Sequence, residues 1–264
     1  MPEGPEVKIA STYYNEFFKG SENIQFEILT EYYETKYVDV FETIQKHLGK
    51  TFQPIFTIGK NIFIPLKNHQ TFNFHLGMTG GWSEHLVKHC HFRVYCAGKE
   101  LFFRDVRKFG KMRIVNNSDI EKKYKIEFDL LNNSYNFEKH FNHLSKKINP
   151  KKSLCSVLMN QSLFPGVGNY IKSEALYAAR LHPEKKWGEL SAKKIKELIL
   201  NTQDIMQRSY STGGAELKDF KNPFHESTFS LKVYGKETDP KGNKIESLVT
   251  SDQRKSWFCP RIQK

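Results

Sequence analysis

The sequence predicts an α+β protein in which a β-sandwich with a leading helix is followed by a helical domain and a short C-terminal hairpin. Three observations predict this order: apolar residues first recur at helical spacing, then alternate with period two from about residue 23 to 115, and return to helical spacing after about residue 132. A chain of 264 residues is long enough for roughly two domains with separate cores. We expect three parts, at residues 1–132, 133–227 and 228–264.

The N-terminal part begins with a helix and continues as strands. Pro5 and Glu6 are typical of a helix start, and Gly20 ends the helical pattern. Between them, four apolar residues share one helical face: Val7, Ala10, Tyr14 and Phe17. The alternating segments that follow are separated by turn signals such as Gly59-Lys60. Short alternating strands of this kind predict a β-sandwich or barrel.

Helical spacing returns in the second part. Ser153, Asn169 and Ser191 can each cap a helix, because their side-chain oxygens can accept a hydrogen bond from an unpaired N–H of the first turn. The last of these helices is expected to end at Gly213-Gly214. From about residue 228, short strand-like pieces predict the hairpin.

The charge of the chain favours an anionic partner. Lysine and arginine outnumber aspartate and glutamate 41 to 29, which gives a formal net charge of +12 and a pI near 9.3. The charges are spread along the sequence, so a partner with a regular negative charge is indicated, nucleic acid above all. A basic protein kept soluble by its charge is the alternative at this point.

Neither a secretory signal nor a membrane span is evident. No basic start is followed by an apolar run, and no apolar segment approaches the length that crosses a bilayer. The cysteines show neither the density nor the spacing of a disulfide framework: Cys90, Cys96, Cys155 and Cys259. An intracellular protein in a reducing compartment is therefore expected.

The first residues can supply a nucleophile. Once Met1 is removed, Pro2 presents a secondary amine that is neutral much nearer to neutral pH than a lysine side chain. Its attack on C1′ of a deoxyribose would give an iminium ion, which labilises the C2′ proton and drives elimination of the 3′ phosphate. Glu3 can protonate the ring oxygen and later shuttle protons. Alternatively, Pro2 only begins a helix whose dipole Glu3 and Glu6 favour.

Read together with later motifs, Pro-Glu-Gly-Pro-Glu-Val at residues 2–7 resembles the start of the formamidopyrimidine-DNA glycosylase and endonuclease VIII family. The resemblance extends over nearly the whole chain in the expected order. It implies that Pro2 is the nucleophile, that Glu3 acts as general acid and base, and that Glu6 takes part in lesion recognition. Lys60 looks like the family lysine that contacts a phosphate and assists elimination, whereas an exposed turn lysine is the ordinary alternative.

Two further motifs look like loops that occupy the space of an extruded base. In His-Leu-Gly-Met-Thr-Gly at residues 75–80, Met78 matches the family methionine that fills the gap. In Phe-Arg-Asp-Val-Arg-Lys-Phe-Gly at residues 103–110, Arg107 would face the orphaned partner base and Phe109 would wedge into the stack. Base flipping needs such wedges because the cost of unstacking must be offset. Without the resemblance, Met78 and Phe109 would be interpreted as core residues.

The stretch 160–177 looks like the helix-two-turns-helix of the family, in which the residue matching Asn169 binds the backbone of the damaged strand. Gly166 and Gly168, ahead of a helix, would let successive backbone amides point at one phosphate, whose charge the helix dipole favours. The alternative is a tight connection without a binding role.

The C-terminal part departs from most bacterial relatives, which end in a four-cysteine zinc finger. Beyond the helical part, Cys259 is the only cysteine and no histidine occurs, so no zinc and no other cofactor is expected. The two arms of the hairpin are placed at residues 233–235 and 253–258, and Arg254 matches the family arginine that binds phosphates beside the lesion. This resembles the zincless finger of the endonuclease VIII-like 1 branch, which shares Gly4. An ordinary surface charge is the alternative for Arg254.

A second group of metal-binding residue types occurs at His85, His89, Cys90 and His91. On an alternating strand, His89 and His91 share one face while Cys90 points away, so the group does not form a closed ligand set. We interpret these side chains as structural.

The resemblance implies a bifunctional DNA glycosylase and AP lyase of base excision repair, which releases oxidised bases and cuts the strand by β,δ-elimination. Gly4 and the zincless hairpin point to pyrimidine and hydantoin lesions over 8-oxoguanine. The partner is damaged DNA, and a monomer without membrane contact is expected, in the nucleus or another site of DNA replication if the source is eukaryotic or viral. A module that binds damaged or gapped DNA without catalysis, or a structural RNA-binding protein, would release no base.

Overall fold

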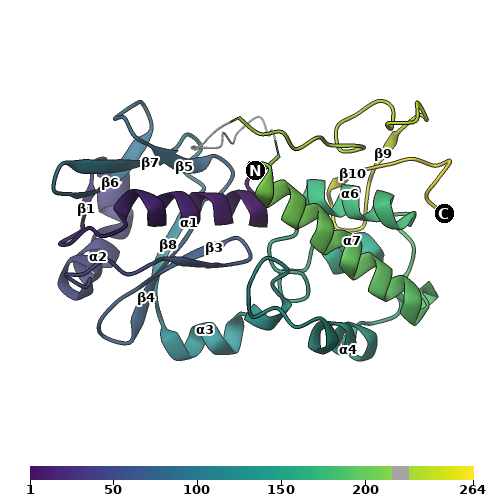
Figure 1. Cartoon of the computed structure of the whole chain (residues 1–264), viewed down its shortest axis with the longest axis horizontal. Coiled ribbons are helices and arrows are strands. Elements are labelled where there is room, and N and C mark those ends of the chain that lie inside the picture. The colour runs from purple at the N-terminus through teal and green to yellow at the C-terminus, as the bar shows by residue number, and fades with distance from the viewer. Residues whose placement is uncertain (216–225) are drawn as a thin grey trace. The chain divides into compact units, whose positions relative to one another are not determined.

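The computed structural model describes residues 1–215 and 226–264, which divide into two compact units (Figure 1). Of the described residues, the first unit holds 1–2, 6–124 and 226–227, and the second holds 3–5, 125–215 and 228–264. The α+β class and the predicted order of strands, helices and hairpin are confirmed. The division into three parts at residues 132 and 227 stays a prediction.

The described elements, in chain order, are α1 (Gly4–Phe18), β1 (Gln25–Ile28), α2 (Glu31–His47), β2 (Phe56–Ile58), β3 (Asn61–Pro65), β4 (Gln70–His75), β5 (Gly80–Ser83), β6 (Cys90–Cys96), β7 (Lys99–Asp105), β8 (Lys111–Asn116), α3 (Asn117–Lys123), η1 (Ile126–Phe128), α4 (Phe137–Lys147), α5 (Leu154–Leu158), α6 (Asn169–Ala179), η2 (Trp187–Glu189), α7 (Ala192–Ser211), β9 (Glu246–Val249) and β10 (Lys255–Phe258).

The first unit is built on two four-stranded antiparallel sheets. Their strand orders are β1-β6-β7-β5 and β2-β3-β4-β8. Aromatic side chains from both sheets share one core, in which Phe92 stacks on Phe103 and the ring of Phe74 meets Phe103 edge to face. The faces of the two sheets are held together by burial of these rings, as in a β-sandwich.

Helix α2 lies where the sequence pattern indicated only strands. Its buried residues, Tyr33, Tyr37, Phe41 and Ile44, recur every three or four positions, which is a helical spacing. The aromatic and β-branched residues of this segment favour strands by intrinsic preference. Burial of one helical face against the core outweighs that preference. Helix α3 begins at residue 117, after the expected strands but ahead of residue 132, where helical spacing was expected to return.

The second unit confirms two of the three predicted helix caps. The hydroxyl of Ser153 accepts a hydrogen bond from the Ser156 N–H at 3.4 Å, and that of Ser191 accepts one from Lys194 at 3.3 Å. The third assignment is wrong, because Asn169 is the first residue of α6 and Gly168 holds the cap position. The side chain of Asn169 is therefore available for a different contact.

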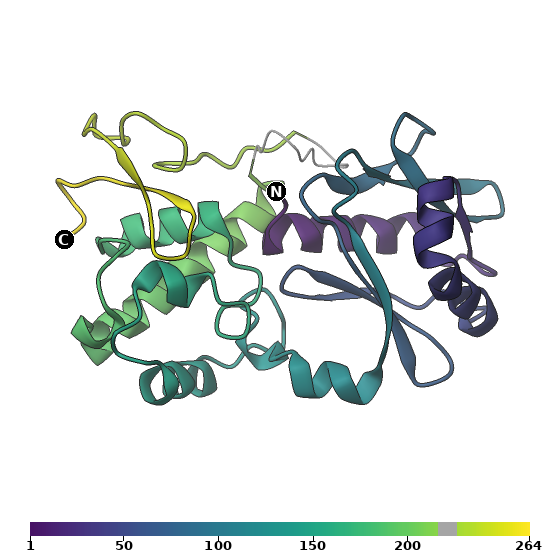
Figure 2. The same cartoon turned by 180° about the vertical axis from the view of Figure 1, so that it is seen from behind.

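The C-terminal hairpin is formed by β9 and β10, which lies beside α6 (Figure 2). The arm expected at residues 233–235 is wrong, because those residues form no strand and the first arm is β9. A buried carboxylate, described below, binds this segment instead of a neighbouring strand.

Within the described ranges, no helix combines the length and apolar character that crossing a membrane requires. All four cysteines are buried thiols without a disulfide.

A buried histidine gives the second unit a testable pH dependence. His140 is fully buried, stacks on Phe128 and pairs with the carbonyl of Leu163 at 2.7 Å. Burial is the main cause that lowers the pKa of His140 to about 4. Between pH 6.5 and 4 the unfolded chain binds this proton and the folded protein does not, so the free energy of unfolding falls as pH falls through that window. One proton contributes at most about 1.4 kcal/mol per pH unit.

We expect His140→Gln, which keeps a donor near the Leu163 carbonyl, to show a flatter pH dependence of the free energy of unfolding between pH 6.5 and 4. Urea unfolding at several pH values measures this, with the exposed His85→Gln as control. An unchanged slope in His140→Gln would contradict the assignment.

Candidate functional site

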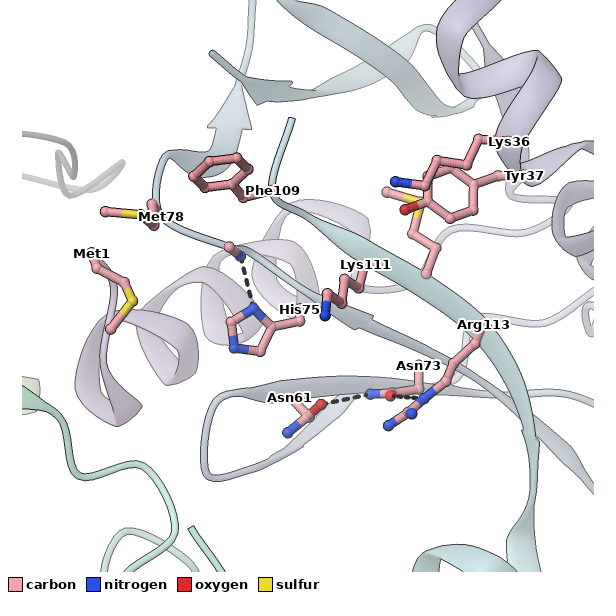
Figure 3. Close-up of a pocket in the computed structure, with 12 residues that line it drawn as sticks. Met1, Lys36, Tyr37, Asn61, Asn73, His75, Met78, Phe109, Lys111 and Arg113 are labelled. Carbon is pink, nitrogen blue, oxygen red and sulfur yellow. Dashed lines mark hydrogen bonds between the residues drawn. The ribbon is translucent and has the colours of Figure 1, made fainter. Parts of the chain in front are cut away.

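The start of the chain lies at a cavity of the first unit. This cavity, of about 590 Å³, is lined by Met1 together with Met78 and Phe109 (Figure 3). Pro2 follows as a buried residue. Pro2, the predicted nucleophile, therefore directly follows Met1, and Met1 lines the same cavity as Met78 and Phe109.

The loops that carry these side chains pack against each other. A Cβ at Gly77 would lie 2.6 Å from the carbonyl carbon of Phe109, and Gly77 has a φ of +67° that favours glycine. Phe109 is 48% exposed, and Met78 is only partly buried, so the interpretation of either as a core residue is wrong. Arg107 is also exposed, and its guanidinium lies 4.8 Å from the ring centre of Phe109.

Asp105 fixes both loops through one buried carboxylate. One oxygen accepts a hydrogen bond from the hydroxyl of Thr79, and the other accepts the Gly110 N–H at 2.7 Å. His91 pairs with the Asp105 carbonyl at 2.9 Å and with Thr30 through its other ring nitrogen, in agreement with the structural role predicted for it. The positions of Met78 and Phe109 thus depend on a residue that carries no predicted chemistry.

Lys60 lies in the turn between β2 and β3, as predicted, but it is only 7% exposed. The alternative of an ordinary exposed turn lysine is therefore wrong. Burial first, and then the positive charges of Lys60, Lys111 and Arg113, lower the pKa of His75 to about 4. His75 is neutral at physiological pH, and its Nδ1 accepts the Gly77 N–H at 2.8 Å.

Glu3 binds the N-terminus of α6 within the second unit. Its two carboxylate oxygens accept the N–H groups of Tyr170 at 3.0 Å and Ile171 at 3.3 Å. These amides are unpaired in any helix, and the helix dipole favours a negative charge there. A Cβ at Gly168 would lie 2.2 Å from the Glu3 carboxyl carbon, so only glycine fits.

The glycines of this loop consequently have an explanation that the sequence did not indicate. Gly4 donates its N–H to the Gly166 carbonyl at 2.8 Å, and a Cβ at Gly4 would lie 3.0 Å from the Gly166 Cα. Close approach of the N-terminal segment requires Gly4 and Gly168, whereas Gly166 has a φ of +87° that favours glycine. The first-turn amides expected to face a phosphate are bound to Glu3, and DNA binding by Gly166 and Gly168 stays a prediction.

Asn169 contacts the hairpin. Its side-chain amide donates to the Lys255 carbonyl at 2.8 Å, next to the exposed Arg254. The turn that presents Arg254 is closed by Thr250, whose N–H and hydroxyl both bond the Arg254 carbonyl at 2.9 Å. The structure thus brings Glu3, Asn169 and Arg254 to the region around the start of α6.

A buried ion pair anchors the same turn. Lys172 on α6 has a fully buried side chain, and its ammonium lies 2.8 Å from a carboxylate oxygen of Asp252, which is 6% exposed. Burial by itself raises the pKa of Asp252, but hydrogen bonds from Lys172 and Thr250 outweigh burial and lower it. The adjacent Ser251 N–H donates to Glu184 at 2.6 Å.

The segment at residues 232–234 is held by Glu174 of α6. Its carboxylate accepts the backbone N–H groups of Lys232, Val233 and Tyr234 at 2.9 to 3.0 Å. Three amides that a strand would pair with a neighbour are satisfied here by one side chain. This is why the predicted arm forms no strand.

Glu6, predicted to recognise the lesion, is fully buried in the first unit. The residue types beyond the helical part do not fit a structural zinc, since a single cysteine and no histidine are present. In the part of the chain that is described, no three His, Cys, Asp or Glu side chains form a group that could hold a metal ion.

Sequence reasoning missed Asp105, Lys172, Glu174 and Asp252. One signal was available, because charged residues at apolar-periodic positions of a helix are typical of buried partners. Lys172 and Glu174 both lie within the predicted helix among apolar residues. Their partners are distant in sequence, so only the structure identifies them.

Comparison with known proteins agrees with this geometry. The family model for the N-terminal domain of formamidopyrimidine-DNA glycosylase matches residues 1–112, and that for the helix-two-turns-helix (H2TH) domain of the same enzyme matches residues 127–221. The formamidopyrimidine-DNA glycosylase of Mycoplasmopsis pulmonis is 30% identical over 100% of this chain and 98% of its own length. That of Streptococcus mutans is 28% identical, with 100% of both chains covered.

Solved structures agree as well. A Lactococcus lactis Fpg bound to DNA with an abasic site superposes with a TM-score of 0.82 at 25% identity, and 99% of each chain is covered. The Fpg of Thermus thermophilus has the same fold, with a TM-score of 0.82 at 24% identity over 99% of this chain and 98% of its own.

The buried ion pair predicts a specific stability pattern. We expect Lys172→Met to lower the free energy of unfolding by about 3 to 5 kcal/mol, because it leaves the Asp252 charge buried without a partner. The double variant Lys172→Met/Asp252→Leu should recover most of that loss. Urea unfolding measures all variants, with the exposed Lys193→Met as control. Equal stability of Lys172→Met and the parent protein would show that the pair is not buried as described.

Proposed function

Since the chain belongs to the formamidopyrimidine-DNA glycosylase family and is a DNA glycosylase that acts on damaged DNA, we propose that it excises the base and cuts the strand through the amine of Pro2. The observation that carries the proposal is the position of the chain's first residue, which lines the cavity shared by Met78 and Phe109. Removal of Met1 leaves the imino group of Pro2 as the first atom of the chain.

The first step replaces one bond at the sugar with another. The Pro2 nitrogen attacks C1′, the N-glycosidic bond breaks, and the base leaves with the bonding electron pair and takes up the proton that the Pro2 nitrogen loses. The ring C1′–O4′ bond then opens as Glu3 supplies a proton to O4′, which gives the iminium ion. A secondary amine forms an iminium ion without an N–H, so its positive charge persists as an electron sink.

The second step uses that sink to break the strand. A base removes the C2′ proton, the electrons move toward the iminium nitrogen, and the C3′–O bond breaks with release of the 3′ phosphate. Removal of the C4′ proton then breaks the C5′–O bond and releases the 5′ phosphate, which completes the δ-elimination. Two backbone amides hold the Glu3 carboxylate in place, which fixes the position from which it takes up and passes on protons. We assign Lys60 to the departing phosphate, since its turn places a buried ammonium near His75 of the cavity.

The remaining predicted residues serve DNA binding in this proposal. Met78, Arg107 and Phe109 occupy the space of the extruded base, which is supported by the exposed positions of Arg107 and Phe109 and the partly buried position of Met78 on two mutually packed loops. Asn169 and Arg254 bind strand phosphates, with Gly166 and Gly168 allowing the close approach of the loop. Glu6 acts in lesion recognition from a buried position.

Oxidised pyrimidines and hydantoins are the proposed lesions. Gly4 supports this choice less than its sequence position indicated, because packing against Gly166 already requires a glycine there. The C-terminal hairpin, which lacks zinc ligands, still supports the choice of oxidised pyrimidines and hydantoins. One similar protein, a Lactococcus lactis Fpg at 25% identity, has been solved with DNA that contains an oxidised pyrimidine.

Covalent trapping tests the nucleophile. With borohydride present, the protein lacking Met1 should become linked to DNA that contains an abasic site, because hydride reduces the iminium ion to a stable amine. A form that retains Met1, or carries an acetylated Pro2, should cut abasic DNA at least about 100-fold more slowly, since no free secondary amine remains. Thermal melting of each form is the control for folding. Undiminished cutting by either blocked form would end the proposal, and a module without catalysis would release no free base.

Gly77→Ala tests whether the two loops act as one unit. The added Cβ would collide with Phe109 and displace both loops, so single-turnover excision should fall by about 10- to 100-fold, as displacements of roughly 1 Å do at other sites. Gly81→Ala is the matched control, because a Cβ at Gly81 meets nothing within 4 Å. If the Gly77→Ala protein is folded and as active as the control, the contact does not position the loops.

A further inference from the structure

One face of the sheet β2-β3-β4-β8 carries a group of polar and basic side chains that the proposed reaction does not use. In the strand register, Asn61 lies opposite His75, and His75 lies opposite Lys111. In the next row Asn73 lies opposite Arg113. Because successive residues of a strand alternate between faces, these five side chains share one face, and all of them line the cavity at Met78 and Phe109 (Figure 3).

Arg113 is held in one orientation on this face. Its Nε donates to the side-chain oxygen of Asn73 at 2.9 Å, and one terminal nitrogen donates to the hydroxyl of Tyr124 at 2.6 Å. Asn73 is only 2% exposed, and its amide nitrogen donates in turn to the Ile62 carbonyl at 3.1 Å. A guanidinium held in this way loses little side-chain entropy when its remaining N–H groups bind a ligand.

Among the described residues, the charged side chains that line the cavity are basic. They are Lys36, Lys111 and Arg113, and no aspartate or glutamate of residues 1–215 and 226–264 lies in the lining. Across residues 1–215 and 226–264, neither Lys111 nor Arg113 forms an ion pair. A sheet face that only met solvent would gain nothing from a buried asparagine that orients an arginine, whereas an anion site needs such a support.

We propose that Arg113, oriented by Asn73, and Lys111 bind one backbone phosphate of the DNA, a contact additional to those proposed for Lys60, Asn169 and Arg254. This inference depends on the proposed function, because it assumes that damaged DNA occupies the cavity. The planar fork of the guanidinium matches two phosphate oxygens, and the ammonium of Lys111 adds a second charge from the neighbouring row. Such a contact fixes the register of the duplex rather than its sequence.

The first test measures the salt dependence of binding. The probe is a duplex that contains a tetrahydrofuran analogue of an abasic site. This analogue carries no base, so the protein can bind it without an N-glycosidic bond to cleave. Arg113→Gln should weaken binding and reduce the slope of log affinity against log salt by about one unit, because one phosphate contact is lost. Arg113→Lys should keep most of the slope. Lys99→Gln, which removes an exposed charge at the first residue of β7, outside the cavity lining, is the matched control and should leave the slope nearly unchanged.

The second test identifies the phosphate. Each phosphate near the lesion is replaced in turn by an uncharged methylphosphonate, and binding is measured with the parent protein and Arg113→Gln. At one position the substitution should weaken the parent protein but not Arg113→Gln, since the two changes remove the same contact.

Two outcomes overturn the inference. An unchanged salt slope in Arg113→Gln does so, and so does an identical methylphosphonate profile in the two proteins. The salt slope and the methylphosphonate profile are both measured from binding, so neither depends on cleavage of the DNA strand. Failure of the Met1-free protein to form the trapped complex would instead reject the proposed function while leaving the phosphate contact measurable.

Discussion

The hydrogen bonds between the Glu3 carboxylate and the first turn of α6 are the interaction on which the proposed catalytic site depends. Adjacent Cα atoms of a chain are about 3.8 Å apart, so fixing Glu3 also limits where the amine of Pro2 can lie. The same contact explains Gly168, whose position leaves no room for a Cβ, and it stands beside the bond from Gly4 to Gly166. The helix N-terminus thus binds an anion, as helix termini often do, but the anion belongs to the protein.

Within each unit, acidic side chains organise segments that have little regular structure of their own. Glu174 binds three successive amides of residues 232–234, and Asp105 joins the loops of Met78 and Phe109. Asp252 pairs with Lys172 beneath the turn that presents Arg254. In a zinc finger, a metal ion and its ligands hold such a turn. Here the ion pair, the Asn169–Lys255 bond and the Ser251–Glu184 bond hold it, and none of them requires a cofactor.

The sequence patterns succeeded where a structural preference is local. Gly20, Ser153 and Ser191 mark helix ends through backbone conformation and capping, which involve only neighbouring residues. The sequence patterns gave the wrong secondary structure where contacts with residues distant in sequence determine it. Helix α2 contains residues that favour strands, yet packing of one of its faces makes it helical. The 233–235 segment has strand-like composition, but its amides are bound by Glu174 from a helix some sixty residues earlier.

By itself, the sequence determined the α+β class and the order of strands, helices and hairpin, and it supplied the predictions for most residues of the candidate site. Periodicity, capping chemistry and short motifs carry that information because each depends on residues close together in the chain. Only the tertiary structure decided that Asn169 contacts the hairpin instead of capping α6, that Gly168 makes room for Glu3, and that Lys60 is buried. It also revealed the support of Arg113 by Asn73 across two strands. The physical reason is that hydrogen bonds and burial between residues far apart in sequence arise only once the chain has folded, and no local pattern records which partners will meet.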